Sequence, residues 1–191
     1  MRMVKIIEQR MQESVDAKER FRDQVGNIQA VSDAMVSAMK SGNKVLICGN
    51  GGSASDAQHI TGELVGRFQK ERKGLPAIAL TTDTSVMTAW CNDYDFSTIF
   101  SRQVEALAKP GDVIIGISTS GNSDNVIKAF VEGKKIGTVN ISMTGRDGGR
   151  LKPMSDYNIN SDSSNTARVQ ECHILAYHII CELVENGMTE E

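Results

Sequence analysis

Residues 45–59 read VLICGNGGSASDAQH, an apolar run followed by a glycine-rich turn and a helix-compatible stretch. A strand that leads through a glycine turn into a helix brings backbone N–H groups and the positive end of the helix dipole together, which favours an anion. The helix would also carry His59 and Glu63 four residues apart on one face. The stretch therefore predicts an anion site with acid–base groups beside it, which suggests chemistry on a phosphorylated small molecule.

Apolar, β-prone runs of the same kind recur along the chain and alternate with helical patterns. The runs lie at 45–48, 77–80, 113–117, 138–141 and 157–159, and the helical patterns at 53–69, 97–108, 123–134 and 166–185. This alternation predicts a parallel sheet covered by helices on both faces, in an order that the pattern does not determine. The first forty residues predict two helices, with a break near Gly26–Asn27 and an end at Ser41–Asn43. We expect a three-layer α/β/α fold in a single domain over residues 1–191.

The composition narrows the class of protein. With 191 residues, of which 40% are hydrophobic, the chain suits one globular domain with a sizeable core. A net charge of −3 argues against nucleic acid as a partner. No apolar stretch approaches the ~20 residues of a membrane span, and the charged N-terminus does not resemble a signal peptide. The four cysteines lack C-x-x-C spacing, so we expect a reducing, cytoplasmic location.

Polar, turn-rich clusters follow four of the apolar runs, at 49–53, 81–85, 118–123 and 144–149. Parallel strands place such clusters at one edge of the sheet, where ligands bind in folds of this type. The cluster at 118–123, STSGNS, predicts a second anion site in which hydroxyls and backbone N–H groups hold a phosphate. Taken alone, it also fits a serine-rich turn with an ordinary N-cap. No Walker motif is present, so we do not expect nucleotide triphosphates.

A third cluster opens the last helical pattern. Glu171 and His178 are seven residues apart and nearly aligned, and Gln170 lies about 80° around the helix from His178, with His173 on the other side. Without the other clusters, His178 would be read as a hydrogen-bonded core histidine. His59 and Glu63 would likewise be read as a surface pair worth about 0.2–0.5 kcal/mol. Polar groups inside a buried helix must be satisfied or functional, so the chemical interpretation is retained.

Four stretches together resemble the phosphoheptose isomerases of the sugar isomerase (SIS) superfamily: CGNGGSASDAQHITGELVGRF, GISTSGNSDNVIKA, TGRDGG and ARVQECHILAYHIICELVE. The resemblance implies a flavodoxin-like, five-stranded parallel sheet and a homotetramer with sites at subunit interfaces, in which the N-terminal helices at 1–42 take part. It also implies interconversion of sedoheptulose 7-phosphate, a phosphorylated seven-carbon sugar, with D-glycero-D-manno-heptose 7-phosphate through a cis-enediol. That reaction opens the ADP-heptose route to the lipopolysaccharide core.

The resemblance further implies roles for individual residues. The catalytic acid–base pair would be Glu63 and His178. Substrate would contact Glu63 and a set of phosphate-binding and sugar-lining residues: Ser118, Thr119, Ser120, Ser123, Asn50, Gly51, Gly52, Asn92, Asp93 and Gln170. One Zn²⁺ per subunit would be held by His59, Glu63, Gln170 and His178.

Alternatives stay open at this point. A carboxylate bound to Zn²⁺ is a poorer base, and glutamine is an unusual zinc ligand. Glu63 would therefore shift between roles, zinc would polarise the carbonyl, or the ion would be structural or incidental. The rival functions are a non-catalytic SIS regulator that binds a replication-initiator protein, and an isomerase or binder of another phosphosugar. The presence of both Glu63 and His178 argues against the regulator.

Overall fold

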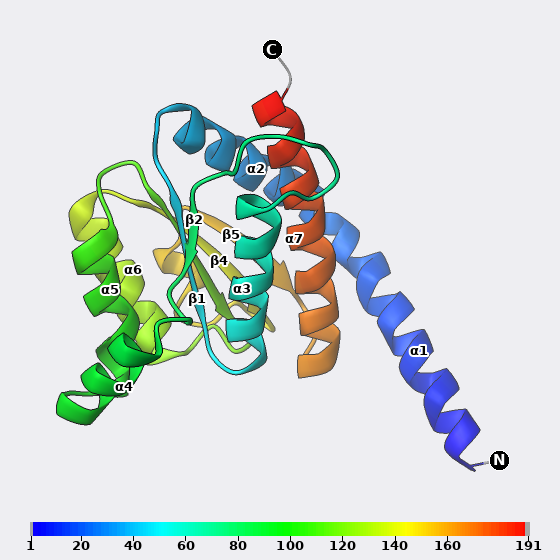
Figure 1. Cartoon of the computed structure of the whole chain (residues 1–191). Coiled ribbons are helices and arrows are strands. Elements are labelled where there is room, and N and C mark those ends of the chain that lie inside the picture. The colour runs from blue at the N-terminus through cyan, green and yellow to red at the C-terminus, as the bar shows by residue number, and fades with distance from the viewer. Residues whose placement is uncertain (1, 190–191) are drawn as a thin grey trace.

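A five-stranded parallel sheet forms the centre of the protein, whose computed structural model describes residues 2–189 (Figure 1). Its strands lie in the order β2-β1-β3-β4-β5, with the bounds β1 (Val45–Gly49), β2 (Ala77–Ala79), β3 (Val113–Ser118), β4 (Val139–Gly145) and β5 (Tyr157–Ser161). This is the flavodoxin-like order that the resemblance implies. The chain passes from β1 to β2 and returns to β3 on the other side of β1. The topological switch point, where ligands bind in such sheets, therefore lies between β1 and β3.

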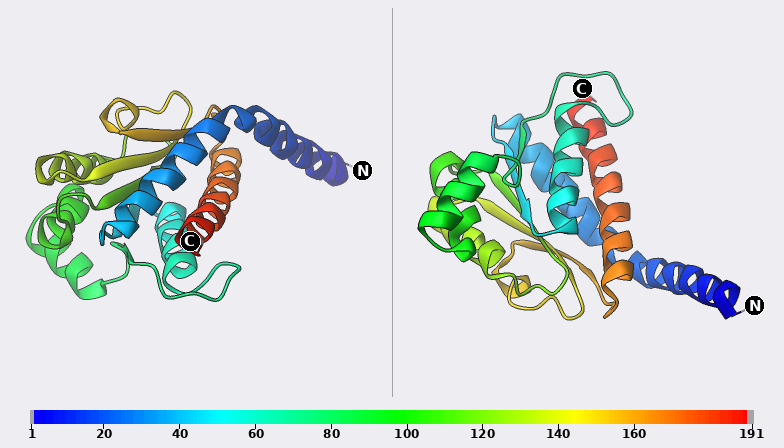
Figure 2. Two further views of the ribbon diagram at one scale, coloured as in Figure 1. Left: turned by 90° about the horizontal axis from the view of Figure 1, so that it is seen from above. Right: turned by 60° about the horizontal axis from the view of Figure 1, so that its bottom comes forward.

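Helices cover both faces of the sheet, as the sequence predicts. One face carries α2 (Val25–Lys40), α3 (Gly52–Val65) and α7 (Thr166–Thr189), and the other carries α4 (Thr84–Asp93), α5 (Ile99–Leu107) and α6 (Asp124–Ile136). Alternate strand residues supply the two cores: Ile47 and Ile115 pack with α2, α3 and α7, whereas Leu46 and Ile114 pack with α5 and α6. Figure 2 shows α1 (Arg2–Phe21) projecting away from these layers.

The helix boundaries depart from the sequence prediction in three places. The predicted break near Gly26–Asn27 is wrong: a 3₁₀ turn at Arg22–Gln24 separates α1 from α2, and Gly26 lies inside α2. Packing of α2 against α7 outweighs the roughly 1 kcal/mol that glycine costs within a helix. The sequence analysis also missed α4, because none of its residues is fully buried and no apolar stripe marks it. Finally, α3 ends at Val65 rather than at 69, because tertiary contacts of the following loop stop it.

Within residues 2–189, no helix combines the length and the apolar composition that crossing a membrane requires.

Candidate active site

Two loops meet at the switch point between β1 and β3. In the parallel register, Gly49 lies opposite Ile117, so the turn into α3 and the turn into α6 leave the sheet side by side. The side-chain amides of Asn50 and Asn125 exchange two hydrogen bonds, of 2.9 and 2.8 Å, between these loops. Asn50, which the resemblance assigns to the sugar site, thus has a partner within the protein. Its place is to hold the glycine turn against the start of α6.

Three serine hydroxyls converge at the N-terminus of α6. Ser118 Oγ lies 2.8 Å from Ser123 Oγ and 3.5 Å from Ser120 Oγ. Ser123 is the N-cap residue, but its side chain accepts no capping hydrogen bond from the described residues of α6. Thr119 lies half-buried within the same turn. The serine hydroxyls and the helix N-terminus together form the kind of site that binds phosphate without Lys or Arg.

Gly121 allows this serine loop to close against the loop after β4. Its φ of +67° lies in the left-handed region, and a Cβ there would lie 2.0 Å from the carbonyl oxygen of Gly148. The N–H of Leu151 also donates to the carbonyl oxygen of Gly121, at 3.0 Å. The loops at 118–123 and 144–149, which the sequence places at one edge, are therefore in direct contact.

The acid–base cluster lies farther along α3, where this helix runs beside α7 (Figure 2). His59 Nε2 is 3.0 Å from Glu63 Oε1 and 3.5 Å from His178 Nε2. The side chains of His59 and Glu63 are 46% and 22% exposed, so the cluster is open to solvent on one side. The structure thus brings together three residues that the sequence analysis named, from positions more than a hundred residues apart.

The other residues that the resemblance assigns to the sugar site lie at different distances from this cluster. Gln170 lies beside the glycine turn, because a Cβ on Gly52 would be 2.9 Å from Gln170 Nε2. His178 is eight residues farther along α7, a rise of about 12 Å. Asn92 and Asp93 end α4 on the opposite face of the sheet and hydrogen-bond to each other at 2.8 Å. Their assignment to the sugar site stays a prediction from the resemblance.

A buried Asp56–Tyr177 pair supports His59 and was missed in the sequence analysis. Tyr177 Oη lies 2.9 Å from His59 Nδ1, and the Tyr177 hydroxyl donates to Asp56 Oδ1 at 3.5 Å. Burial raises the pKa of Tyr177. Burial also raises the pKa of Asp56, although a hydrogen bond from Tyr177 and the charge of His59 act in the opposite direction. Tyr177 therefore remains a neutral hydroxyl. The D-x-x-H spacing of Asp56 and His59 and the Tyr177–His178 dipeptide were the available signals.

His59, Glu63 and His178 also fit a metal ion. One ligand atom from each lies within 4.8 Å of the other two, and two imidazole nitrogens with a carboxylate oxygen are a donor set that zinc accepts. Metal-binding histidines usually donate their second ring N–H to a fixed acceptor. If Nε2 of His59 held the ion, Nδ1–H would donate to Tyr177, which in turn donates to Asp56. Nδ1 of His59 thus already has its partner.

His173 belongs to the core and not to this cluster. Its ring is fully buried, and Nε2 donates to the carbonyl oxygen of Thr144 at 2.9 Å. Burial lowers the pKa of His173 to about 4, so the ring is neutral at physiological pH. Of the three histidines of the chain, only His59 and His178 therefore face the candidate site.

Comparison with known proteins gives consistent matches. A family model described as "SIS domain" matches residues 11–145. The chain is 58% identical over 160 residues to a phosphoheptose isomerase from Aquifex aeolicus, covering 84% of each chain. It is 48% identical over 192 residues to one from Clostridium acetobutylicum, covering 99% of this chain and 98% of that one. The solved structure of a phosphoheptose isomerase from Neisseria gonorrhoeae superposes with a TM-score of 0.92 at 41% identity, covering 96% of this chain and 99% of the other.

Proposed function

The chain belongs to the phosphoheptose isomerases of the SIS-domain family, and on that premise we propose that it interconverts sedoheptulose 7-phosphate and D-glycero-D-manno-heptose 7-phosphate. It is an aldose–ketose isomerase, and the reaction is the first step toward ADP-heptose and the lipopolysaccharide core. The observation that carries the proposal is the acid–base cluster of His59, Glu63 and His178 on a helix pair that begins beside the three converging serine hydroxyls. The hydroxyls hold the terminal phosphate, and this remote binding energy orients the reacting carbons.

In the proposed mechanism, Glu63 is the carbon base and His178 the oxygen acid. Starting from the ketose, Glu63 takes a proton from C1 while His178 gives a proton to the C2 carbonyl oxygen, which yields a cis-enediol. His178 then takes the proton from the C1 hydroxyl, and Glu63, whose carboxyl proton exchanges with solvent at the open side of the cluster, gives a proton to C2, which completes the aldose. The carboxylate and the imidazole both end in their starting forms. Groups of this kind contribute about 10²–10⁴-fold to the rate when they are positioned.

The sugar lies, in this proposal, between the serine hydroxyls and the acid–base cluster. Gly51, Gly52 and Gln170 form the wall along that path, since Gln170 lies beside Gly52 at the start of α3. Asn50 supports the same wall through Asn125. The missing side chain of Gly52 leaves room for Gln170, whose amide can donate to and accept from sugar hydroxyls.

We also propose that His59, Glu63 and His178 hold one Zn²⁺ per subunit, because their donor atoms converge. When bound, the ion would polarise an oxygen of the sugar. Glu63 and His178 would move protons only while they are released from the ion, because a ligand bound to Zn²⁺ is a poorer base. Gln170 completes the ligand set that the resemblance implies. Because it lies about 12 Å from His178 along α7, we expect it to reach the ion of another copy in the oligomer rather than that of its own chain.

We also propose the homotetramer with sites at subunit interfaces that the resemblance implies. Helix α1 extends from the body (Figure 1). It exposes a row of apolar side chains: Met3, Val4, Ile6, Ile7, Met11 and Val15. Exposed apolar surface of this kind marks an interface. We propose that α1 and α2 pack between subunits. Light scattering on the wild type and on Ile7→Asp would test this, with dissociation of the variant as the expected result.

The same proposal places the enzyme in the cytoplasm. All four cysteines are free thiols, and Cys48, Cys172 and Cys181 are buried. Burial raises the pKa of Cys48 to about 12, so this thiol is unreactive. A chain that uses cysteine as a small apolar residue is suited to a reducing compartment.

The test of the proposed function is a conversion assay on the purified protein, with and without added Zn²⁺. Sedoheptulose 7-phosphate is the expected substrate, and fructose 6-phosphate and ribulose 5-phosphate are the comparison ketoses. We expect an aldose phosphate to form from the seven-carbon ketose with the highest kcat/KM. Preference for a shorter ketose would reassign the substrate. Absence of turnover on all three, with intact fold and oligomer, would overturn the isomerase assignment.

A further inference from the structure

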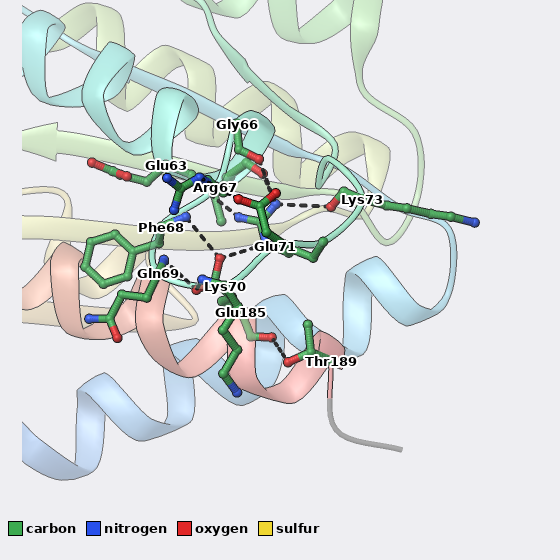
Figure 3. Close-up of polar contacts among 12 residues, drawn as sticks. Glu63, Gly66, Arg67, Phe68, Gln69, Lys70, Glu71, Lys73, Glu185 and Thr189 are labelled. Carbon is green, nitrogen blue, oxygen red and sulfur yellow. Dashed lines mark hydrogen bonds and ion pairs between the residues drawn. The ribbon is translucent and has the colours of Figure 1, made fainter.

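The loop between α3 and β2 is pinned to α7 by a single carboxylate. Residues 66–76 leave the end of α3 and pass along α7, with the backbone N–H groups of three of them directed at Glu185 (Figure 3). Glu185 accepts these hydrogen bonds at 3.0 Å from Phe68, 2.7 Å from Gln69 and 2.8 Å from Lys70. Glu185 is 1% exposed, so one buried acceptor fixes three successive residues of the loop.

Arg72 completes the arrangement from within the same loop. Its Nε donates to Glu185 Oε1 at 3.0 Å, and its side chain is 4% exposed. Its two Nη groups donate to the carbonyl oxygens of Glu63 and Leu64, at 2.7 and 2.9 Å, which end α3. These contacts, here named the Arg72–Glu185 clasp, join the last turn of α3, the loop and α7.

The clasp touches both members of the acid–base pair. The backbone N–H of Phe68 donates to Glu185. The ring of Phe68 stacks on the His178 ring, with centroids 5.8 Å apart and planes 25° apart. Glu185 and His178 are seven residues apart on α7, and therefore share a face. Arg72 binds the carbonyl oxygen of Glu63 itself. The position of each reacting side chain thus depends on the same buried ion pair.

Stability alone gives a weak reason for such a pair. Burial would raise the pKa of Glu185, but hydrogen bonds from three backbone N–H groups and the charge of Arg72 outweigh burial and lower it. A buried ion pair is often matched or exceeded in stability by apolar residues of the same volume, because both charges lose their hydration. What the pair provides beyond stability is a defined geometry at the points that it contacts.

We propose that Arg72, Glu185 and Phe68 are positioning residues for the isomerase reaction. The clasp sets the end of α3 that carries Glu63, and it holds the Phe68 ring against His178 so that the imidazole keeps one orientation toward the substrate. The inference rests on the proposed roles of Glu63 and His178. None of the three positioning residues needs to touch the sugar.

The test uses two variants of the full-length oligomer. Glu185→Gln keeps the shape but turns an amide toward backbone N–H groups, and Phe68→Leu removes the ring while leaving the clasp. We expect kcat to fall about 10–100-fold in the first and about 10-fold in the second, with KM changed less than about 3-fold, because small misplacements of catalytic groups are costly. In ¹³C-histidine-labelled protein, the Cε1–H signal of His178 should shift in both variants, while that of buried His173 stays in place.

Asp112→Asn supplies the matched control, since Asp112 is another buried carboxylate that binds backbone N–H groups and a cation far from the site. It should lower the melting temperature without changing kcat of the folded enzyme or the His178 signal. The inference is overturned if Phe68→Leu and any folded Glu185→Gln keep the wild-type kcat and His178 signal, or if Asp112→Asn lowers kcat equally. A wild type that fails to turn over refutes the proposed function instead, and the His178 signal then still tests the clasp.

Discussion

The backbone N–H groups at the amino ends of β1 and β3 have a different kind of hydrogen-bond partner from those that follow the carboxyl ends. At the amino ends, Asp112 accepts hydrogen bonds from the N–H groups of Lys44 and Lys109, at 2.9 and 2.8 Å, and pairs with Lys44 Nζ at 2.5 Å. At the carboxyl ends, the same strands lead into α3 and α6, whose N-termini have no side-chain cap among the described residues. Serine hydroxyls gather there in place of a carboxylate.

The difference separates stability from chemistry. A carboxylate from the chain itself satisfies the amino ends, and it would repel a second anion there. Neutral hydroxyls and helix N-termini at the carboxyl ends are free to serve a phosphate. Glu185 resembles Asp112 in this respect, because its carboxylate accepts hydrogen bonds from backbone N–H groups of a loop beside the acid–base cluster. The substitutions below should therefore sort into losses of turnover, of ligand affinity and of stability.

The largest expected effect is on turnover, at the carboxyl ends. Glu63→Gln removes the proposed base but keeps the size of the side chain, so kcat should fall by about 10²–10⁴-fold. The melting temperature should stay near that of the wild type, because Glu63 is partly exposed and a surface contact such as that with His59 adds little. Steady-state kinetics and calorimetry measure the two quantities. If Glu63→Gln lowered the melting temperature enough to explain the fall in kcat, the carboxyl ends would not differ from the amino ends in the way described.

The next effect is on stability, at the amino ends. Asp112→Asn leaves Lys44 without its carboxylate and weakens the hydrogen bonds to two backbone N–H groups. We expect a loss of about 2–3 kcal/mol in the free energy of unfolding, since the side chain of Asp112 is fully buried but Lys44 is partly solvated. Denaturant titration would measure it. A loss below about 0.5 kcal/mol, the usual size for a surface substitution, would show that Asp112 is dispensable.

Tyr177→Phe tests the support behind His59. The substitution keeps the ring but removes the hydroxyl between His59 and Asp56, so the affinity for Zn²⁺ should fall about 10–100-fold. Competition with a chromophoric chelator measures the Kd without relying on activity. Tyr157→Phe, on β5, is the matched control and should bind Zn²⁺ as the wild type does. Equal Kd values for all three proteins would remove Tyr177 from the account.

Ser123→Ala should weaken phosphate binding with little cost to the fold. The hydroxyl makes no capping hydrogen bond to the described part of α6, so its loss leaves the helix intact. A hydrogen bond to a charged group is worth about 1.5–3 kcal/mol, so KM and the inhibition constant for inorganic phosphate should rise about 10-fold or more. Ser155→Ala, whose hydroxyl pairs with Ser142, is the control. An unchanged inhibition constant would place the phosphate elsewhere.

The smallest expected effect is on the melting temperature at low pH. Hydrogen bonds and cationic neighbours outweigh burial and lower the pKa values of Asp112 and Glu185 in the folded state. Their contribution is complete above their unfolded pKa values of about 4, and it is lost as the pH falls from there through the lower folded values. The melting temperature should therefore drop as the pH falls below about 5. In Asp112→Asn this drop should be shallower, and an identical profile would show that Asp112 is not responsible.

Most of the fold was predictable because the strands are buried on both faces. Runs such as Val113–Ile117 are continuous and apolar, and short runs of this kind are typical of a covered parallel sheet. Helix α4 escaped prediction because it buries none of its residues fully. The end of α3 escaped because Arg72 and Glu185, 113 residues apart, decide it. A local sequence pattern does not predict a contact between residues so far apart in the chain.

For the candidate site, too, the sequence predicted local relationships but not contacts between distant residues. The spacing of His59 and Glu63 indicated a shared helix face, and their 3.0 Å separation confirms the contact. The proximity of His178 to them depends on packing of α3 against α7, and the sequence analysis reached it only through the family resemblance. Tyr177 was missed because an apolar helix conceals a buried hydroxyl until its partners are known.

The central claim, that Glu63 and His178 carry an enediol isomerisation, is tested most directly by isomerising sedoheptulose 7-phosphate in D₂O. Deuterium should enter C2 of the aldose and C1 of the recovered ketose with the wild-type enzyme. With Glu63→Gln it should enter neither position at a comparable rate, while inhibition by phosphate is retained. Conversion without deuterium incorporation, or wild-type exchange in Glu63→Gln, would contradict the account.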